Sequence, residues 1–195
     1  MMWFRKTKPL SLEQQLAVFD ECGIKMRPDL TIDDLLYCHG RDQYEKEQFE
    51  LLLETLAGES KREPFLDFSD NIWHLKRKCI NDHGSYVQVA SKMSRLTGFT
   101  LPIADARDYV SLPEGKAWLS FSLDGMQYRW DLKVHGDLLD QTVLSKFADL
   151  LKLLGAGKRF FCLELKGNDC LVGCARSDQL GTLREKTKLN FQWLV

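Results

Sequence analysis

Apolar and polar residues alternate along two consecutive segments of the chain, 117–123 and 126–134. They are separated by Asp124 and Gly125, a pair that readily adopts the positive φ angles of a two-residue hairpin loop. Because successive side chains of a strand point to opposite faces, this loop predicts one pairing register. That register gathers seven apolar residues on one face: Leu119, Phe121, Leu123, Met126, Tyr128, Trp130 and Leu132. We therefore expect a hairpin with one core face and one solvent face.

An amphipathic helix is predicted next, from about Asp140 to Leu154. Its apolar residues recur at helical spacing and form one stripe: Val143, Leu144, Phe147, Leu150, Leu151 and Leu154. Charged and polar residues occupy the opposite side, and Gly155 and Gly157 follow as stop signals.

The same order then repeats. A second hairpin is predicted from Lys158, with Gly167 and Asn168 as its loop. Ser177 is the expected N-cap of a shorter helix, and residues 191–195 form a last strand. The two-residue loop places six residues on a single apolar face: Phe161, Leu163, Leu165, Cys170, Val172 and Cys174.

Helices dominate the first 60 residues. Ser11 and Gln14 have the spacing of a capping box, which predicts a helix ending at Gly23. Thr31 is expected to cap a short helix, and a longer one is predicted from Asp42 to about Ala57. We expect residues 1–60 to form an N-terminal helical part and 61–195 an α+β part, or both to share a single compact domain.

The middle of the chain contains a charged surface connection, 58–68, and a segment, 69–80, that fits either a strand or a helical turn. Ser85 is expected to cap a helix that runs to about Thr97, and residues 103–110 are expected to form an edge strand. The predicted fold class is α+β: N-terminal helices followed by a mostly antiparallel sheet built from two hairpin-helix units, with helices on one face.

Composition narrows the class of protein. The net charge is −1, which argues against nucleic acid as a partner, and 44% of the residues are hydrophobic. The six cysteines are scattered, the first residues lack the apolar core of a signal peptide, and no run is apolar enough to span a membrane. These features predict a cytoplasmic protein with free thiols.

The clearest charge feature lies in 29–54, where eight acidic residues accompany two basic ones, a net charge of −6. Such a surface could steer a basic protein partner. Trp73, which precedes a basic run at 76–78, has the character of a binding hot spot. The predicted partner-binding residues are Asp33, Asp34, Asp42, Glu45, Glu50 and Trp73. The simpler interpretation is a solvated helix surface and a core tryptophan.

Three residue pairs suggest chemistry without forming a recognised motif. Cys79 and His83, four residues apart, could provide a nucleophile and a base. Glu164 and Lys166 could hold a metal-activated water, as in a nuclease, if a further acid such as Asp131 joined them. Cys170 and Cys174 have a spacing compatible with zinc, but the predicted register buries them. We therefore expect no catalytic residue, no metal and no cofactor.

The order of several tracts resembles a group of small uncharacterised bacterial proteins that are similar to the immunity proteins of polymorphic toxins. The tracts are Asp33-Asp34-Leu35-Leu36-Tyr37, Gly40-Arg41-Asp42-Gln43-Tyr44-Glu45, Ser69-Asp70-Asn71-Ile72-Trp73 and His83-Gly84-Ser85-Tyr86. The resemblance implies a small cytoplasmic protein that covers the active site of a basic toxin domain. The leading hypothesis is thus a non-enzymatic binding protein. A small hydrolase or metal-dependent nuclease, and a structural subunit that uses a sheet edge or helix stripe, are the alternatives.

Overall fold

The computed structural model describes residues 9–63, 65–167 and 169–195. Within them the helices are α1 (Leu12–Glu21), α2 (Ile32–Cys38), α3 (Arg41–Lys46), α4 (Glu50–Leu56), α5 (Ser85–Leu96), α6 (Thr142–Leu153) and α7 (Ser177–Thr187). The strands are β1 (Ile72–Leu75), β2 (Ile103–Ser111), β3 (Lys116–Leu123), β4 (Met126–Leu132), β5 (Arg159–Glu164), β6 (Cys170–Ala175) and β7 (Gln192–Trp193).

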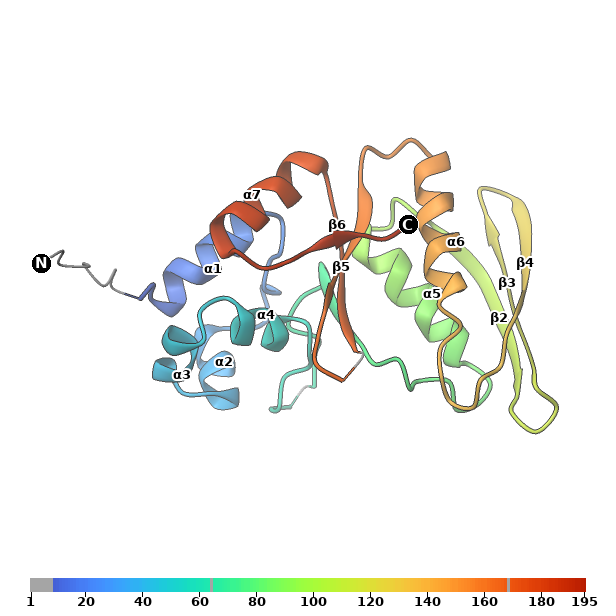
Figure 1. The fold of residues 1–195 in the computed structure, drawn as a ribbon, viewed down its shortest axis with the longest axis horizontal. Coiled ribbons are helices and arrows are strands. Elements are labelled where there is room, and N and C mark those ends of the chain that lie inside the picture. Colours follow the sequence, from blue (N-terminus) through green and yellow to red (C-terminus); the bar gives the residue numbers. More distant parts are fainter. Residues whose placement is uncertain (1–8, 64, 168) are drawn as a thin grey trace, which may run out of the picture.

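The described residues form two antiparallel sheets (Figure 1). The larger has the strand order β1-β6-β5-β7, and the smaller has the order β2-β3-β4. The predicted α+β class and the antiparallel pairing are confirmed. Both predicted hairpins form, but each belongs to its own sheet. The ambiguous segment 69–80 contributes β1, an edge strand of the larger sheet.

The register of the first hairpin agrees with the prediction. Leu123 lies opposite Met126, and the apolar residues of β3 and β4 share one face. Asp124 and Gly125 have φ angles of 50° and 79°, as the tight loop requires. The side chains of Leu119, Phe121 and Leu123 are buried on that face.

The second hairpin differs from the prediction by one residue. Glu164 lies opposite Cys170, and the backbone N–H of Leu165 donates to the carbonyl of Asp169 at 2.8 Å. The loop is therefore one residue longer than expected; Asn168, part of the predicted loop, lies outside the described residues. A one-residue slip moves one strand's side chains to the opposite face. The predicted single apolar face is wrong, because Phe161 and Leu163 point away from Cys170.

Both faces of the larger sheet are buried. Ile72, Phe161, Leu163 and Leu171 pack into a core with α1 to α4 and α7. The residues on the other face pack with α5, α6 and the inner face of the smaller sheet: Leu75, Phe160, Cys170 and Val172. The molecule is thus layered as helices, sheet, helices and sheet (Figure 1), so helices cover both faces of the larger sheet.

The helix predicted from Asp42 to Ala57 is wrong, because the chain breaks into α3 and α4. Phe49, between them, has a φ of 65°. The fully buried side chain of Gln15 holds this break: its amide nitrogen donates to the carbonyl of Tyr44 at 3.0 Å. Its oxygen accepts from the N–H of Phe49 at 2.8 Å. A helix through this point would have left no free backbone groups for Gln15.

The two serine caps expected at Ser85 and Ser177 are also corrected, since each serine is the first residue of its helix. The free N–H groups of α5 are bound instead by Asp108 of β2. Its carboxylate accepts from the N–H groups of Gly84 at 2.6 Å and Tyr86 at 2.8 Å. This contact ties the smaller sheet to the start of α5, where a negative charge is favourable.

Candidate binding surface and the predicted catalytic pairs

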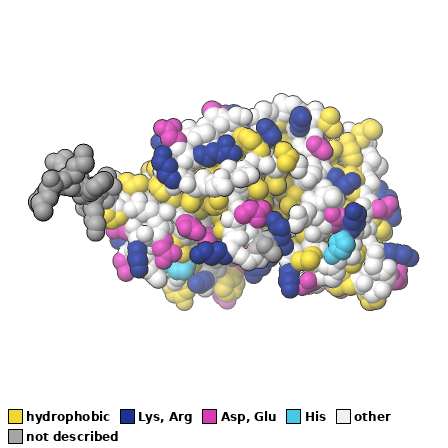
Figure 2. Space-filling model, viewed as in Figure 1, with side chains coloured by type: hydrophobic (Ala, Val, Ile, Leu, Met, Phe, Trp, Pro, Cys, Tyr) yellow, Lys and Arg dark blue, Asp and Glu magenta, His cyan; other side chains and the backbone are white. Residues whose placement is uncertain are grey.

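The predicted acidic residues lie on three short consecutive helices. Asp33, Asp42 and Glu50 are exposed, and each stands in the first turn of its helix, α2, α3 and α4 respectively. Glu45, on α3, is half-buried. Acids at helix N-termini interact favourably with the helix dipole, so part of this pattern has a structural explanation. Figure 2 shows acidic side chains, with basic ones among them, at the end of the molecule where α2 to α4 lie.

Asp34 differs from the other predicted acidic residues because its carboxylate forms hydrogen bonds within the protein. Its carboxylate accepts from the N–H of Thr31 at 2.8 Å and from the Thr31 hydroxyl at 2.9 Å. These bonds, with the nearby Arg62, lower the pKa of Asp34. Asp34 therefore caps α2, and substituting it would disturb the helix as well as the surface charge.

Few of these acids are neutralised by ion pairs. Asp34 contacts Arg62 at 3.4 Å, and Asp29 contacts Arg27 at 3.1 Å. Within the described part of the chain, Asp33, Asp42, Glu45 and Glu50 form no ion pair. The surface of α2 to α4 thus keeps its negative charge in the folded protein.

An exposed aromatic residue lies within this acidic surface. The side chain of Tyr37, on α2, is 62% exposed, and the guanidinium of Arg62 lies over its ring at 5.7 Å from the centroid. Arg62 is held in turn by Asp34. Phe65, in the same connection as Arg62, is 63% exposed. The sequence analysis did not single out Tyr37 or Phe65, although Tyr37 follows directly on the acidic pair.

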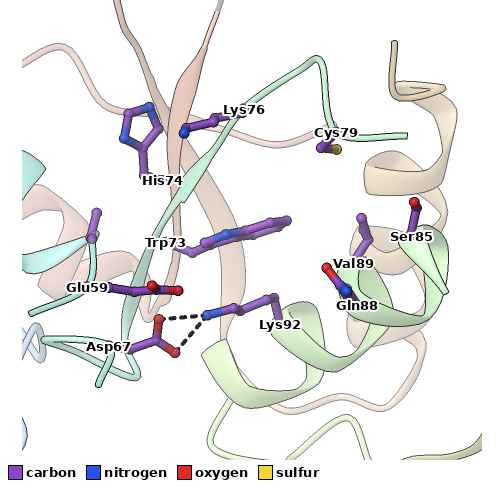
Figure 3. A pocket seen from close by; sticks show the side chains of 12 residues that line it. Glu59, Asp67, Trp73, His74, Lys76, Cys79, Ser85, Gln88, Val89 and Lys92 are labelled. Carbon is purple, nitrogen blue, oxygen red and sulfur yellow. Dashed lines mark hydrogen bonds and ion pairs between the residues drawn. The ribbon is translucent and has the colours of Figure 1, made fainter. Parts of the chain in front are cut away.

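Trp73 lies apart from the acids on β1, where it is half-buried. It lines a cavity of about 460 Å³ between the end of α4, β1 and α5, and its ring points from β1 towards α5 (Figure 3). Val89 of α5, and Cys79, line the same cavity. Trp73 packs against the core between the two sheets, so the structure does not join it to the acidic helices.

The charged groups in this cavity hold two segments of the chain together. The ammonium of Lys92 on α5 contacts both carboxylate oxygens of Asp67, at 2.7 and 2.8 Å (Figure 3). Arg95 also binds Asp67 and approaches Asp70 at 3.6 Å. This network fastens the connection between α4 and β1 onto α5.

The pair Cys79 and His83 lacks the properties of a nucleophile and its base. Burial, with the nearby carboxylates of Asp169 and Asp137, raises the pKa of Cys79 to about 11. The thiol is thus protonated at neutral pH, whereas a nucleophilic cysteine needs the thiolate. His83 uses Nδ1 to accept the N–H of Val110 at 3.0 Å.

Glu164 and Lys166 do not form a metal-binding pair. The carboxylate of Glu164 binds the guanidinium of Arg77 through both oxygens, at 3.0 and 3.1 Å. Lys166 is exposed beyond the end of β5. Asp131, the proposed third acid, lies on β4 in the other sheet.

Cys170 and Cys174 share the sheet face towards α5 and α6. Burial raises the pKa of each to about 12. Among the residues that the structure describes, no three His, Cys, Asp or Glu side chains gather closely enough to hold a metal ion. None of the described helices has the length and apolar character needed to cross a membrane.

Aromatic and cationic side chains form a row on the outer face of the smaller sheet. His83 packs on Tyr109 with ring centroids 5.1 Å apart, and Tyr109 stacks on Trp118 at 6.3 Å. The guanidinium of Arg129 covers Trp118 at 4.2 Å. The alternation of side chains along β3 and β4 is enough to place Trp118 and Arg129 on the outer face. The positions of Tyr109 and His83 beside them depend on the pairing of β2 with β3.

Comparison with models of protein families, with curated proteins and with solved structures gives no match. The resemblance to immunity proteins therefore stays a prediction from the order of sequence tracts.

Proposed function

We propose that this protein is a non-enzymatic binding protein, of the immunity type, that captures a basic toxin domain through α2 to α4 and the adjoining connection. The observation that carries the proposal is Tyr37, which is exposed on α2 with the guanidinium of Arg62 over its ring. Asp33, one helical turn earlier on α2, is exposed as well and forms no ion pair within the described residues.

Tyr37 suits a binding surface for a physical reason. A tyrosine offers a large contact area and loses little rotamer freedom on binding, and tyrosine and arginine are enriched at energetic hot spots. The contacts from Asp34 to Arg62 and from Arg62 to Tyr37 hold both side chains before a partner arrives. Phe65 adds a second exposed aromatic side chain in the same connection.

The acids supply orientation. Asp33, Asp42 and Glu50 are exposed and carry charge that a basic surface would meet. Complementary charge raises the rate of association and selects the partner more than it adds affinity. The resemblance to immunity proteins supports a toxin domain as this partner. The six free cysteines fit a reducing compartment, which supports the cytoplasm as the location.

The test begins with capture. The immobilised protein and its Tyr37→Ser variant are exposed to lysate of the cell that produces the protein, and the retained proteins are identified. We expect a basic protein that the first retains and the second loses. With both components purified, Tyr37→Ser should raise the dissociation constant about 30-fold, the effect of a hot spot of about 2 kcal/mol.

The charge component is tested with a matched pair of double variants. Asp33→Asn with Glu50→Gln should slow association and weaken its dependence on salt. Asp149→Asn with Glu185→Gln makes the same chemical changes at exposed acids of α6 and α7 and should leave association unchanged. Asp34 is spared because it caps α2. Equal capture by the wild type and Tyr37→Ser, or equal effects of the two double variants, would contradict the proposal.

A further inference from the structure

β4 is one of the two edge strands of the smaller sheet, and β2 is the other. β4 pairs with β3 on one side, and nothing in the described chain pairs with its other side. In Figure 1 it lies at the end of the molecule opposite α2 and α3. A long edge strand with open backbone groups is a template for pairing with another chain.

The tight loop fixes which backbone groups are open. Leu123 and Met126 flank a two-residue loop and form a hydrogen-bonded pair, and such pairs alternate with non-bonded pairs along an antiparallel ladder. The N–H and C=O groups of Gln127, Arg129 and Asp131 therefore point away from β3. In the part of the chain that the structure describes, they have no hydrogen-bond partner.

Apolar side chains accompany this edge on the inner face of the sheet. Met126 is 64% exposed, and Tyr128 and Trp130 are half-buried. The ammonium of Lys146 on α6 lies 5.5 Å from the Trp130 ring centroid. Leu153, seven residues further along α6 and on the same helix face, is 79% exposed. A second strand added here would cover part of this apolar surface.

The outer face presents charges of opposite sign. Arg129 covers Trp118, and its Nε lies 3.8 Å from the Asp131 carboxylate. The Asp131 side chain is 89% exposed. These two residues also carry the open backbone groups, so a strand paired with β4 would meet both charges directly.

Charge complementarity selects one register for two copies of β4 related by a two-fold axis. If the axis passes beside Trp130, Arg129 of each copy lies opposite Asp131 of the other, which forms two favourable cross-strand pairs. If it passes beside Arg129, the two arginines oppose each other. If it passes beside Tyr128, Arg129 opposes Gln127 and Asp131 faces the loop. The first register alone of these three satisfies both charges.

We propose that the chain forms a homodimer through antiparallel pairing of β4 with β4 of a second copy, centred on Trp130, which joins the two smaller sheets into one. Each Arg129–Asp131 pair exchanges two backbone hydrogen bonds in this arrangement. The two Trp130 side chains face each other on the inner side, and Tyr128 lies opposite Leu132. The isologous interface closes at two copies. It leaves α2 to α4 free, so it goes beyond the proposed capture of a toxin and is independent of it.

The experiment is analytical ultracentrifugation of the full chain at concentrations up to about 1 mM. This range would detect a dimer with a dissociation constant as weak as about 1 mM. We expect a monomer–dimer equilibrium. Arg129→Asp and Asp131→Arg should each weaken it about tenfold or more, because each places like charges opposite one another at two sites. The exchange Arg129→Asp with Asp131→Arg restores both pairs and should restore the dimer. In the register centred on Arg129, Arg129→Asp would exchange one like-charged pair for another, so this variant would not weaken the dimer.

Arg107→Asp is the matched control, since it makes the same charge change on β2, the other edge of the sheet. It should leave the equilibrium unchanged. Amide hydrogen exchange provides a second readout: the N–H groups of Arg129 and Asp131 should be protected in the dimer and unprotected in Arg129→Asp. A chain that stays monomeric, a dimer indifferent to Arg129→Asp, failure of the double exchange, or unprotected amides in the dimer would overturn the proposal.

Discussion

The side-chain oxygen of Gln15 accepts the backbone N–H of Phe49 at 2.8 Å, across 34 residues of sequence. The same amide group donates to the carbonyl of Tyr44, so one buried side chain satisfies backbone groups on both sides of the break between α3 and α4.

Replacing Gln15 by Ala should therefore destabilise the protein by about 2 to 6 kcal/mol, because each of the two buried backbone groups left without a partner costs about 1 to 3 kcal/mol. Urea unfolding monitored by circular dichroism measures the change. Gln14→Ala is the control: it removes only the exposed capping box of α1 and should cost about 1 kcal/mol or less. Equal losses from the two variants would show that Gln15 does not hold the break.

Gly173 on β6 lies against the ring of Phe161 on β5. A Cβ at this position would overlap the ring of Phe161, and Cζ most closely. Gly173→Ala should cost about 1 to 3 kcal/mol by overpacking, measured by thermal or urea unfolding. Gly181→Ala, in the interior of α7 with open space around it, should instead stabilise by up to about 1 kcal/mol.

A second variant keeps this prediction specific. Phe161→Leu removes the ring atoms that an alanine would meet, so the double variant should be less destabilised than the sum of the single changes. Additive losses would contradict the contact between Gly173 and Phe161.

Asp140, before α6, should make stability depend on acid pH. Burial raises its pKa, but hydrogen bonds from the N–H groups of Lys133 and Thr142 and from the Thr142 hydroxyl outweigh burial and leave the pKa lowered. A lowered folded-state pKa contributes stability above the unfolded value of about 3.9, which is lost as pH falls through the folded pKa.

Urea unfolding between pH 7 and pH 2 tests this. Asp140→Asn should be less stable than the wild type at pH 7, and its stability should fall less steeply below about pH 4. Asp149→Asn, at an exposed position of α6, should keep the wild-type profile. An unchanged acid slope in Asp140→Asn would show that another group governs the loss.

The thiols of Cys79, Cys170 and Cys174 should react slowly in the folded protein. The pKa of Cys79 is about 11, and those of Cys170 and Cys174 are about 12, whereas an ordinary cysteine has a pKa of about 8.5. At pH 8 the thiolate fraction of Cys79 is thus lower than that of a free cysteine by a factor of about 100 or more. Reaction with a disulfide reagent, compared with and without denaturant, measures the rates.

In the folded protein, any fast phase of this thiol reaction should come from cysteines other than Cys79. The variant Cys79→Ser should therefore leave that phase unchanged. A fast-reacting thiol that disappears in Cys79→Ser would revive the hydrolase alternative, because it would require a stabilised thiolate at Cys79.

The two hairpins show why one register could be predicted and the other could not. In the first, apolar and polar residues alternate because only one face is buried, so a one-residue slip would expose Phe121 and Leu123. In the second, Phe160 and Phe161 are both buried, on opposite faces of the sheet. Without a polar face to oppose the slip, the sequence pattern carried no information about register, and the loop length decided it.

The candidate site likewise has some features that the sequence indicated and others that depended on the fold. The acidic composition of α2 to α4 was evident from the sequence, but the position of Arg62 over Tyr37 brings together residues 25 positions apart and depended on the fold. Local spacing suggested Cys79 with His83, and Glu164 with Lys166. In the folded protein His83 accepts a hydrogen bond from the N–H of Val110, and Glu164 binds Arg77. The partners of these side chains are set by contacts between distant segments and not by nearness in sequence.

The sequence by itself determined the helices and strands with a clear amphipathic period, the antiparallel α+β class, and the register of the hairpin at Asp124 and Gly125. Each of these depends on neighbours along the chain, whose spacing records which side is buried. Only the tertiary structure decided that the larger sheet is covered on both faces, that Gln15 divides a helix, and that Asp108 caps α5. Those outcomes depend on polar groups and packed side chains that meet from distant segments, and no local periodicity records such meetings.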